Sequence, residues 1–285
     1  WMKIWCDLTH GADKKAMLNA MLCEGTGCGC GGSGSNLQTI PLQFWFCRNP
    51  GLALPLIALQ YHEVKLNIKF CTIAGSAEVW CDYIFLDTDE RRRFAQVSHE
   101  YLIEQVQYNN GADINSAVNL RFNHPVKELV WRAMANSTGC CNVSGGQADI
   151  CDVVLQLNGH DRFRKRSGEY FSVTQRYEHH TGAEASDEVT AASIAAATTE
   201  AQLAALALTR TNPCVDAGTV YCYSFALKPE EHQPSGTCNF SRIDNAVMQV
   251  GLNTATGAAL TAQATKLDVY AVNYNVLRIM SGMGG

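Results

Sequence analysis

The feature that most constrains the fold of this chain is an internal repeat, here an echo of residues 39–86 in residues 219–274. Residues 39–70 hold a strand-like apolar run, a connection rich in Pro and Gly, and a longer strand, and residues 219–252 repeat that succession. A third strand-like pair follows in step, with residues 78–86 matching residues 266–274. Solenoid repeats are only about 20–50 residues long. An echo with this spacing therefore predicts two similar domains in one chain.

The repeated runs alternate polar and apolar residues with the period of two that is typical of a half-buried strand. In residues 59–70, for example, Val64, Leu66 and Ile68 share one parity. Such runs predict that strands over residues 40–47, 59–70 and 78–86 contribute to a core. The expected core side chains are Phe44, Phe46, Ile68, Tyr83, Phe85, Leu129, Trp131, Leu155, Tyr221, Tyr223 and Phe225.

The rest of the chain also favours strands. Short strand-like segments at residues 100–108, 118–122, 126–133 and 150–157 are separated by turn residues, which indicates an antiparallel sandwich or barrel. Residues 1–23 have helix-compatible spacing of apolar residues and precede a glycine-rich loop. The Ala-rich segment 183–208 is expected to be a surface insertion, either an amphipathic helix or a low-complexity loop.

Composition limits the class of protein. A chain of 285 residues with a net charge of −5 and a pI near 5.9 has room for about two domains. Its charge argues against an extended surface for nucleic acid, which needs an excess of Lys and Arg. Local basic clusters remain at residues 91–93 and 162–166. The most apolar run, residues 52–59, is far shorter than the roughly 20 residues of a membrane span.

The cysteines and the first residues carry two further expectations. The 13 cysteines are odd in number and scattered through strand-like runs, so we expect buried reduced thiols, at Cys47, Cys71, Cys81, Cys151 and Cys222, rather than disulfides. The chain opens with Trp and Met and shows no basic-then-apolar signal segment. We therefore interpret the sequence as an internal fragment of a longer protein.

The sequence patterns that resemble nucleotide-binding or metal-binding motifs are incomplete. Gly27, Gly29 and Gly32 fit G-x-G-x-x-G, but a helix precedes the run and a strand follows it, the reverse of a dinucleotide site. His62-Glu63 lacks the second histidine of H-E-x-x-H, and His179-His180 is not the H-x-H pair of a cupin metal site. We expect no catalytic residue, cofactor or metal.

Two polar features have structural interpretations. Asp87, Asp89 and Glu90 precede a run of arginines and are expected to cap a short helix. Three Asn-x-Ser/Thr triplets make Asn136, Asn142 and Asn239 candidate glycosylation sites.

Long ordered blocks carry a family resemblance. They are PGLALPLIALQYHEVK (50–65), DYIFLDTDERRRFAQ (82–96), HEYLIEQVQ (99–107), FNHPVKELVW (122–131), LNGHDRF (157–163), YSFALKPEEHQPSGTCNFSRIDNA (223–246) and YAVNYNVLRIMSGMGG (270–285). The sequence resembles the major capsid proteins of nucleocytoplasmic large DNA viruses, above all those of algal phycodnaviruses. The glycine-rich loop and the Ala-rich insertion lie outside the match.

The resemblance implies an all-β double jelly roll with short helices in its loops. Residues 1–96 would be the C-terminal part of a first, incomplete jelly roll, and residues 97–285 the second. Three such chains would form a pseudo-hexagonal capsomer that tiles an icosahedral shell, assembled in the host-cell cytoplasm. The implied partners are further copies of the chain, minor capsid proteins and glycans, without direct nucleic-acid binding and without enzymatic turnover.

Two rival interpretations stay open. A carbohydrate-binding jelly roll would expose aromatic side chains on a strand face, whereas Trp45, Trp80 and Trp131 lie in apolar runs that favour a core. A β-sandwich hydrolase would need a nucleophile, a carboxylate pair or a metal, and no such set stands out.

Overall fold

The computed structural model describes residues 1–22, 39–68, 77–113, 117–134, 150–182, 220–252 and 266–284. The chain divides into two compact units that alternate along the sequence. Unit 1 consists of Trp1–Leu42, Val106–Asn136 and Gly145–Asn273, and unit 2 consists of Gln43–Gln105, Ser137–Ser144 and Tyr274–Gly285.

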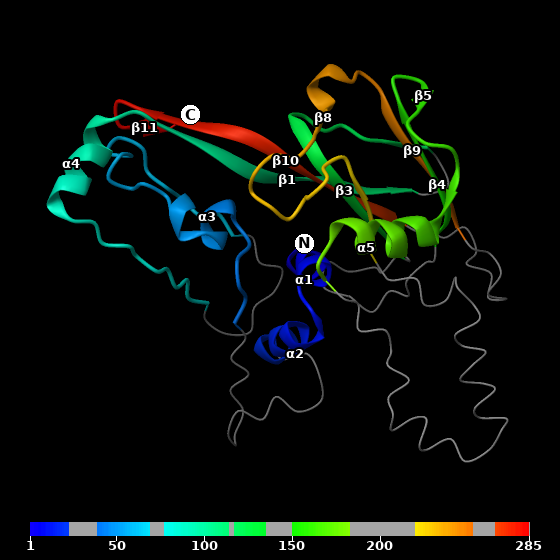
Figure 1. Ribbon diagram of the computed structural model, residues 1–285, viewed down its shortest axis with the longest axis horizontal. Coiled ribbons are helices and arrows are strands. Elements are labelled where there is room, and N and C mark those ends of the chain that lie inside the picture. Colours follow the sequence, from blue (N-terminus) through cyan, green and yellow to red (C-terminus); the bar gives the residue numbers. More distant parts are fainter. Residues whose placement is uncertain are drawn as a thin grey trace, which may run out of the picture. The chain divides into compact units, whose positions relative to one another are not determined.

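Two antiparallel sheets form the frame of unit 1 (Figure 1). The first sheet has the order β1 (His99–Asp113), β10 (Lys266–Met280), β3 (Pro125–Met134) and β7 (Tyr221–Ser224), with β8 (Cys238–Asn239) on β3 and β11 (Met283–Gly284) on β10. The second sheet has the order β2 (Val118–Asn119), β9 (Ala246–Leu252), β4 (Ile150–Leu157) and β5 (His160–Asp161), with β6 (Arg166–Ser167) on β4. Residues 99–105 of β1, residues 274–280 of β10 and all of β11 belong to unit 2.

The core of unit 1 lies between these sheets. Leu129 and Trp131 of β3 pack with Leu155 of β4 and Met248 of β9, and none of these side chains is more than 1% exposed. The predicted burial of Leu129, Trp131, Leu155 and Tyr221 is confirmed, while Tyr223 and Phe225 are half-buried against the same cluster. The predicted strands at 100–108, 126–133 and 150–157 correspond to β1, β3 and β4.

Alternation along β3 separates two faces. Leu129 and Trp131 point into the sandwich, so Glu128 and Val130 lie on the opposite face. Val130 is nevertheless fully buried. Something must therefore cover this outer face, and the helices do so.

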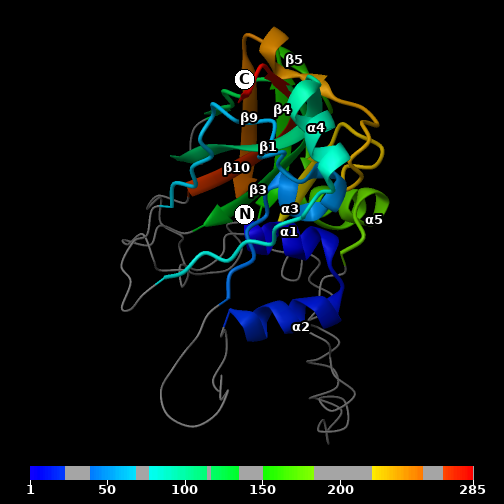
Figure 2. The same cartoon turned by 90° about the vertical axis from the view of Figure 1, so that its left-hand side faces the viewer.

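Helices of unit 1 come from both ends of its sequence. The predicted helix over residues 1–23 is two helices, α1 (Met2–Thr9) and α2 (Ala12–Met21), because His10 is extended and Gly11 starts the second. Figure 2 shows α1 beside the sandwich and α2 beyond it. The π-helical turn η2 (Tyr170–Thr174) runs directly into α5 (Gln175–His179), and η3 (Phe240–Arg242) precedes β9.

Unit 2 has a much smaller core. It contains α3 (Trp45–Arg48), η1 (Pro50–Leu52) and α4 (Thr88–Gln96). Ala58, Leu59 and Ile279 are its buried cluster. Asp87 accepts a hydrogen bond from the Thr88 backbone amide at 2.8 Å, and Asp89 and Glu90 stand in the first turn of α4. The predicted helix cap is confirmed.

The strand predictions for the first echo are wrong. Residues 40–47 are irregular up to α3, and neither residues 59–68 nor residues 78–86 contain a strand. Periodicity selects a face, but a strand also needs a neighbour for its backbone groups. In the described part of unit 2, β1, β10 and β11 pair among themselves. In the second echo, the longer strand expected at the end of residues 219–252 is β9, which begins only at Ala246, after η3.

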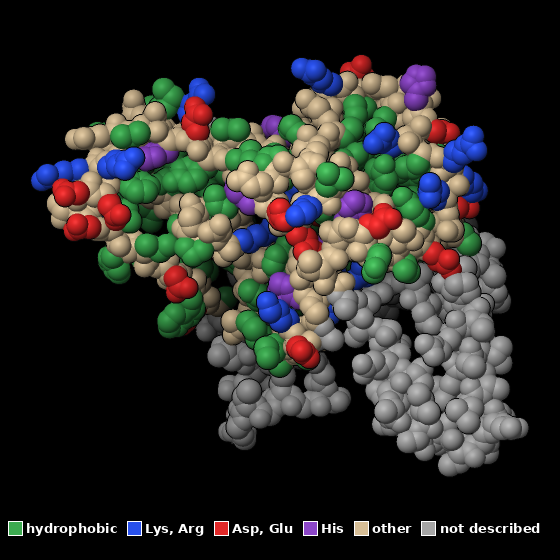
Figure 3. Space-filling view, in the orientation of Figure 1, with side chains coloured by type: hydrophobic (Ala, Val, Ile, Leu, Met, Phe, Trp, Pro, Cys, Tyr) green, Lys and Arg blue, Asp and Glu red, His purple; other side chains and the backbone are tan. Residues whose placement is uncertain are grey.

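The core predictions for the first echo fail for the same reason. Phe44, Ile68, Tyr83 and Phe85 are 37%, 43%, 69% and 94% exposed, and Phe46 is half-buried. Trp80, also expected inside, is 88% exposed. Figure 3 shows hydrophobic side chains at the surface around α3 and α4. Because these residues form no sheet, their predicted apolar side faces no second layer, and the buried side chains Ala58 and Leu59 lie outside the predicted core set.

Further predictions have mixed outcomes. The glycine-rich loop, the Ala-rich insertion at 183–208 and Cys71 lie outside the described residues. Cys222 is a buried thiol, as predicted, but Cys47 and Cys81 are exposed thiols, contrary to the prediction. No described helix combines the length and apolar character that a bilayer crossing requires.

Candidate functional site

Helix α1 covers the outer face of β3 and β7. Ile4 and Leu8, four residues apart and so on one side of the helix, pack against Val130, Val220 and Cys222. An isolated helix of this length is not stable in water. Its attachment to the sheet must therefore come from tertiary contacts.

The C-terminal end of α1 is capped by residues far along the chain. Arg176 of α5 donates to the Asp7 carbonyl at 2.9 Å, and the Gly182 amide donates to the Leu8 carbonyl at 2.7 Å. Thr181 Oγ1 lies 3.1 Å from the Thr9 carbonyl oxygen. The last carbonyls of a helix lack partners within it. Arg176 of α5 and the segment that follows α5 supply them.

His180 anchors that segment in the sheet. Its Nε2 lies 3.2 Å from Oε2 of Glu128, and its Nδ1 lies 3.2 Å from Oε1 of Glu230. The side chain of His180 is 1% exposed, that of Glu128 is 7% exposed and that of Glu230 is 20% exposed. A proton on each ring nitrogen gives both carboxylates a positive partner, so the geometry favours a buried imidazolium.

The electrostatics of the cluster agree with its geometry. Burial alone would lower the pKa of His180, but hydrogen bonding with Cys222, Glu128 and Glu230 outweighs burial and raises it. Burial alone would raise the pKa of Glu230, but hydrogen bonds from His180 and Thr181 outweigh burial and lower it. His180 and Glu230 therefore hold each other in their charged forms.

A thiol, an imidazole and carboxylates in one place invite comparison with a nucleophilic cysteine site. A catalytic histidine takes the thiol proton on a neutral ring nitrogen, whereas hydrogen bonding with Cys222, Glu128 and Glu230 raises the pKa of His180 and favours a ring that is already protonated. Cys222 is 1% exposed, burial raises its pKa, and its Sγ lies 3.6 Å from the Phe171 carbonyl. A buried thiol held in its neutral form cannot attack a substrate. The cluster instead holds the segment that follows α5 against the sheet.

Comparison with known proteins identifies the family to which this chain belongs. A model of the "Large eukaryotic DNA virus major capsid protein" family matches residues 90–202 and 208–285, and a model of the "Major capsid protein N-terminus" matches residues 1–87. The chain belongs to this family of viral major capsid proteins. It is 47% identical to the major capsid protein of Pyramimonas orientalis virus over 302 aligned residues, covering 100% of this chain.

Other family members give the same result. The major capsid proteins of Paramecium bursaria Chlorella virus 1 and Phaeocystis pouchetii virus are 40% and 37% identical to it, each over 86% of this chain. The chain spans 70%, 65% and 64% of the lengths of the Pyramimonas, Chlorella and Phaeocystis virus proteins, about two thirds of each.

A solved structure extends the likeness to the fold. A chain of the "PBCV-1 virus capsid, quasi-atomic model" matches with a TM-score of 0.64 and 34% identity, covering 100% of this chain and 78% of that one. This likeness and the antiparallel sheets of unit 1 confirm the predicted all-β jelly-roll class.

The candidate glycosylation sites of this family member differ in their surroundings. Asn136 and Asn142 lie outside the described residues. Asn239 ends β8, and its Oδ1 accepts a hydrogen bond from the Ser241 amide at 3.0 Å. Ser241 Oγ in turn accepts one from the His124 amide at 2.8 Å. Both polar side chains of this triplet therefore take part in the turn that starts η3.

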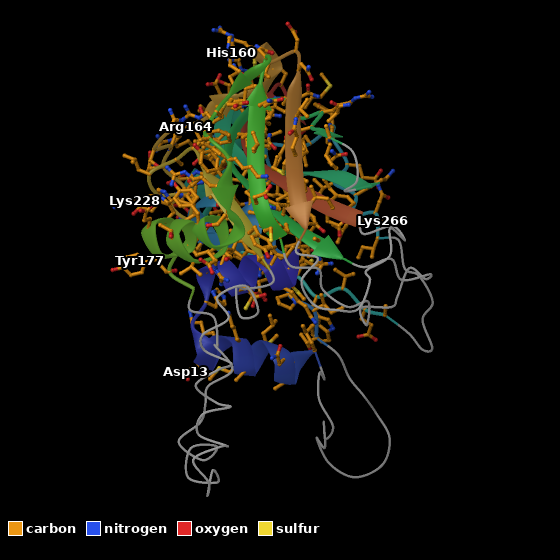
Figure 4. All side chains as sticks on the ribbon, turned by 90° about the vertical axis from the view of Figure 1, so that its right-hand side faces the viewer. Asp13, His160, Arg164, Tyr177, Lys228 and Lys266 are labelled. Atoms are coloured by element: carbon orange, nitrogen blue, oxygen red, sulfur yellow. The ribbon has the colours of Figure 1, made fainter. Side chains whose placement is uncertain are left out.

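The basic segment 162–166 is partly neutralised within the chain. Lys165 Nζ lies 2.9 Å from Asp152 Oδ2, and the Arg166 guanidinium stacks 4.2 Å from the centre of the Tyr170 ring. Arg162 and Arg164 are exposed, and Arg164 lies at the outer edge of the sandwich, below His160 in Figure 4.

The His180 cluster is not recognisable in the sequence, where His179-His180 stands out only as an incomplete metal motif. Glu128 and Glu230 lie far from His180 along the chain, and their spacing has no signature. The usable signal was Glu128 itself, a carboxylate inside the strand-like run VKELVW, since buried carboxylates are normally paired. In the described part of the chain, no group of His, Cys, Asp and Glu side chains is arranged to hold a metal.

Proposed function

We propose that three copies of this chain associate into a pseudo-hexagonal capsomer that tiles the icosahedral shell of a large DNA virus, and that the chain works without enzymatic turnover. The observation that carries this proposal is the 47% identity to a viral major capsid protein across the whole chain. A chain with two similar sandwiches presents two similar sides, so three copies present six. In our proposal residues 1–96 are the C-terminal part of the first jelly roll and residues 97–285 are the second.

The surface chemistry supports a role in assembly. Unit 2 exposes several large apolar side chains, including Trp80 and Phe85. Extended exposed apolar area on a protein usually marks a surface that another chain covers. In unit 1, exposed Arg162 and Arg164 supply charges for ion pairs between subunits; each is weak, below about 1 kcal/mol, but they add up over many copies.

Sedimentation velocity and negative-stain electron microscopy of the purified chain test this proposal. We expect a species of three times the 31.1 kDa monomer mass with a hexagonal outline. A concentration-independent monomer would overturn it.

Further proposed partners are minor capsid proteins and glycans, and the proposed location is the virion after assembly in the host cytoplasm.

A carbohydrate-binding module is the rival of another class. Its binding face would need exposed aromatic rings on a strand. Trp131 is fully buried in β3, and exposed Trp80 lies in a segment without strand structure. Binding to a glycan array by a monomer would favour the rival, whereas trimers that bind no saccharide would exclude it.

A further inference from the structure

The contacts around His180 link the protonation of its ring to the position of helix α1. Glu230 Oε1 faces His180 Nδ1 and also accepts the Thr181 amide at 2.9 Å, while Glu230 Oε2 accepts the Thr181 hydroxyl at 2.6 Å. The same Thr181 hydroxyl contacts the Thr9 carbonyl at the end of α1. A continuous chain of contacts thus runs from the buried ring to the C-terminal cap of α1.

The fit between α1 and this segment is tight. A side chain on Gly182 would place its Cβ 2.4 Å from the Asp7 carbonyl oxygen and from the Leu8 backbone. Residues 181 and 182 therefore cannot shift without losing their hydrogen bonds to Leu8 and Thr9. If His180 leaves its pocket, the contacts of Thr181 and Gly182 with Thr9 and Leu8 are lost, and of the three capping contacts Arg176 on the Asp7 carbonyl remains.

The titratable and charged groups near the ring come from every packed element. They are Glu128 on β3, Cys222 on β7, Glu230 after β7, Arg176, Glu178 and His179 on or beside α5, and Asp7 and His10 at the end of α1. Several are engaged elsewhere. Asp7 pairs with Lys15 at 3.3 Å, His179 Nδ1 contacts the Leu227 carbonyl at 3.1 Å, and Glu178 accepts from Gln175 at 3.3 Å. Glu128 and Glu230 are the carboxylates that directly face the ring.

We propose that His180, Glu128 and Glu230 form a proton-controlled latch that holds α1 on β3 and β7 and lets it detach as the pH rises. In the closed state the ring is a cation between two carboxylates. In the open state it meets water and behaves as an ordinary histidine.

The sign of the pH dependence follows from the proton count. Below the ordinary histidine pKa of 6.5, both states hold the proton and the latch contributes fully. Above that pH the open state releases the proton while the closed state, with its raised pKa, keeps it. Opening then becomes easier by up to tenfold per pH unit, the limit for one proton.

Hydrogen exchange by mass spectrometry on the whole chain tests the latch. We would follow a peptide covering α1 between pH 6 and 9, correct for intrinsic exchange, and use a β4 peptide as internal reference. We expect the protection of α1 to fall up to tenfold per unit above pH 7 while β4 changes little. Flat α1 protection across this range would overturn the proposal.

Two variants locate the effect. His180→Gln should lower α1 protection at pH 6 and abolish its pH dependence, whereas the neighbouring control His179→Gln should match the unaltered chain. If His180→Gln fails to fold, Glu230→Gln, at the more exposed carboxylate, should lower α1 protection at pH 7 and spare β4. Protection of α1 unchanged in Glu230→Gln, or lost equally in His179→Gln, would count against the latch.

Discussion

The rings of Trp131 in β3 and Phe171 in η2 lie 5.3 Å apart, centroid to centroid, and neither side chain has any exposed surface. Phe171 also touches Phe163 and Tyr170, with ring centroids at 5.2 and 5.1 Å. Phe171 thus fixes η2, and with it the start of α5, against the sheet that carries Glu128.

Replacing Phe171 by Ala should destabilise unit 1 strongly. The change removes a fully buried ring and leaves a cavity, which typically costs about 3–5 kcal/mol. Urea denaturation followed by circular dichroism measures the loss. Val173→Ala is the matched control, since Val173 is in the same turn but 57% exposed, and it should change stability by less than about 0.5 kcal/mol. Equal effects of the two changes would contradict the packing described.

Gly168→Ala should distort the joint between β4 and β6. A Cβ at Gly168 would lie 1.9 Å from the Ile150 carbonyl oxygen and 3.3 Å from the Tyr221 ring. Neither neighbour can move freely, so we expect a loss of about 1–3 kcal/mol. Thermal unfolding measures it. Gly11→Ala, where no atom lies within 4 Å of the added Cβ, should leave the melting temperature nearly unchanged.

Glu230 should make stability depend on pH in acid. Because the folded pKa of Glu230 lies below its ordinary 4.5, its contribution is complete above pH 4.5 and is lost as the pH falls through the folded value. Glu230→Gln should therefore cost about 1–3 kcal/mol at pH 6, and the difference from the unaltered chain should shrink below pH 4. Denaturation at a series of pH values checks this. A difference that persists undiminished at pH 3 would rule out the charge as its source.

Exposed aromatic rings of unit 2 should drive association. Trp80 and Phe85 are 88% and 94% exposed, so changing both to Ser removes apolar surface without opening a cavity. We expect little change in the melting temperature and weaker self-association by light scattering. Tyr177→Ser, at an equally exposed ring of α5 in unit 1 (88%), provides the comparison. If the double change leaves association intact, another surface must be responsible.

The sequence by itself determined the fold class, the family and much of the second half. Strands such as β3 and β4 were predictable because alternation and β-branched residues act locally. The start of α4 was predictable because the side chain of Asp87 can cap a helix. The same local pattern in residues 59–68 misled, because alternation says nothing about whether a neighbouring strand is present.

Only the tertiary structure decided which side chains meet. His180, Glu128, Glu230 and the end of α1 come from four separate parts of the chain, and the packing of helices and loops on the sheet brings them together. The physical reason is that a period of two or 3.6 records which face of an element is apolar, whereas the partner of a buried charge is chosen by the packing of distant elements.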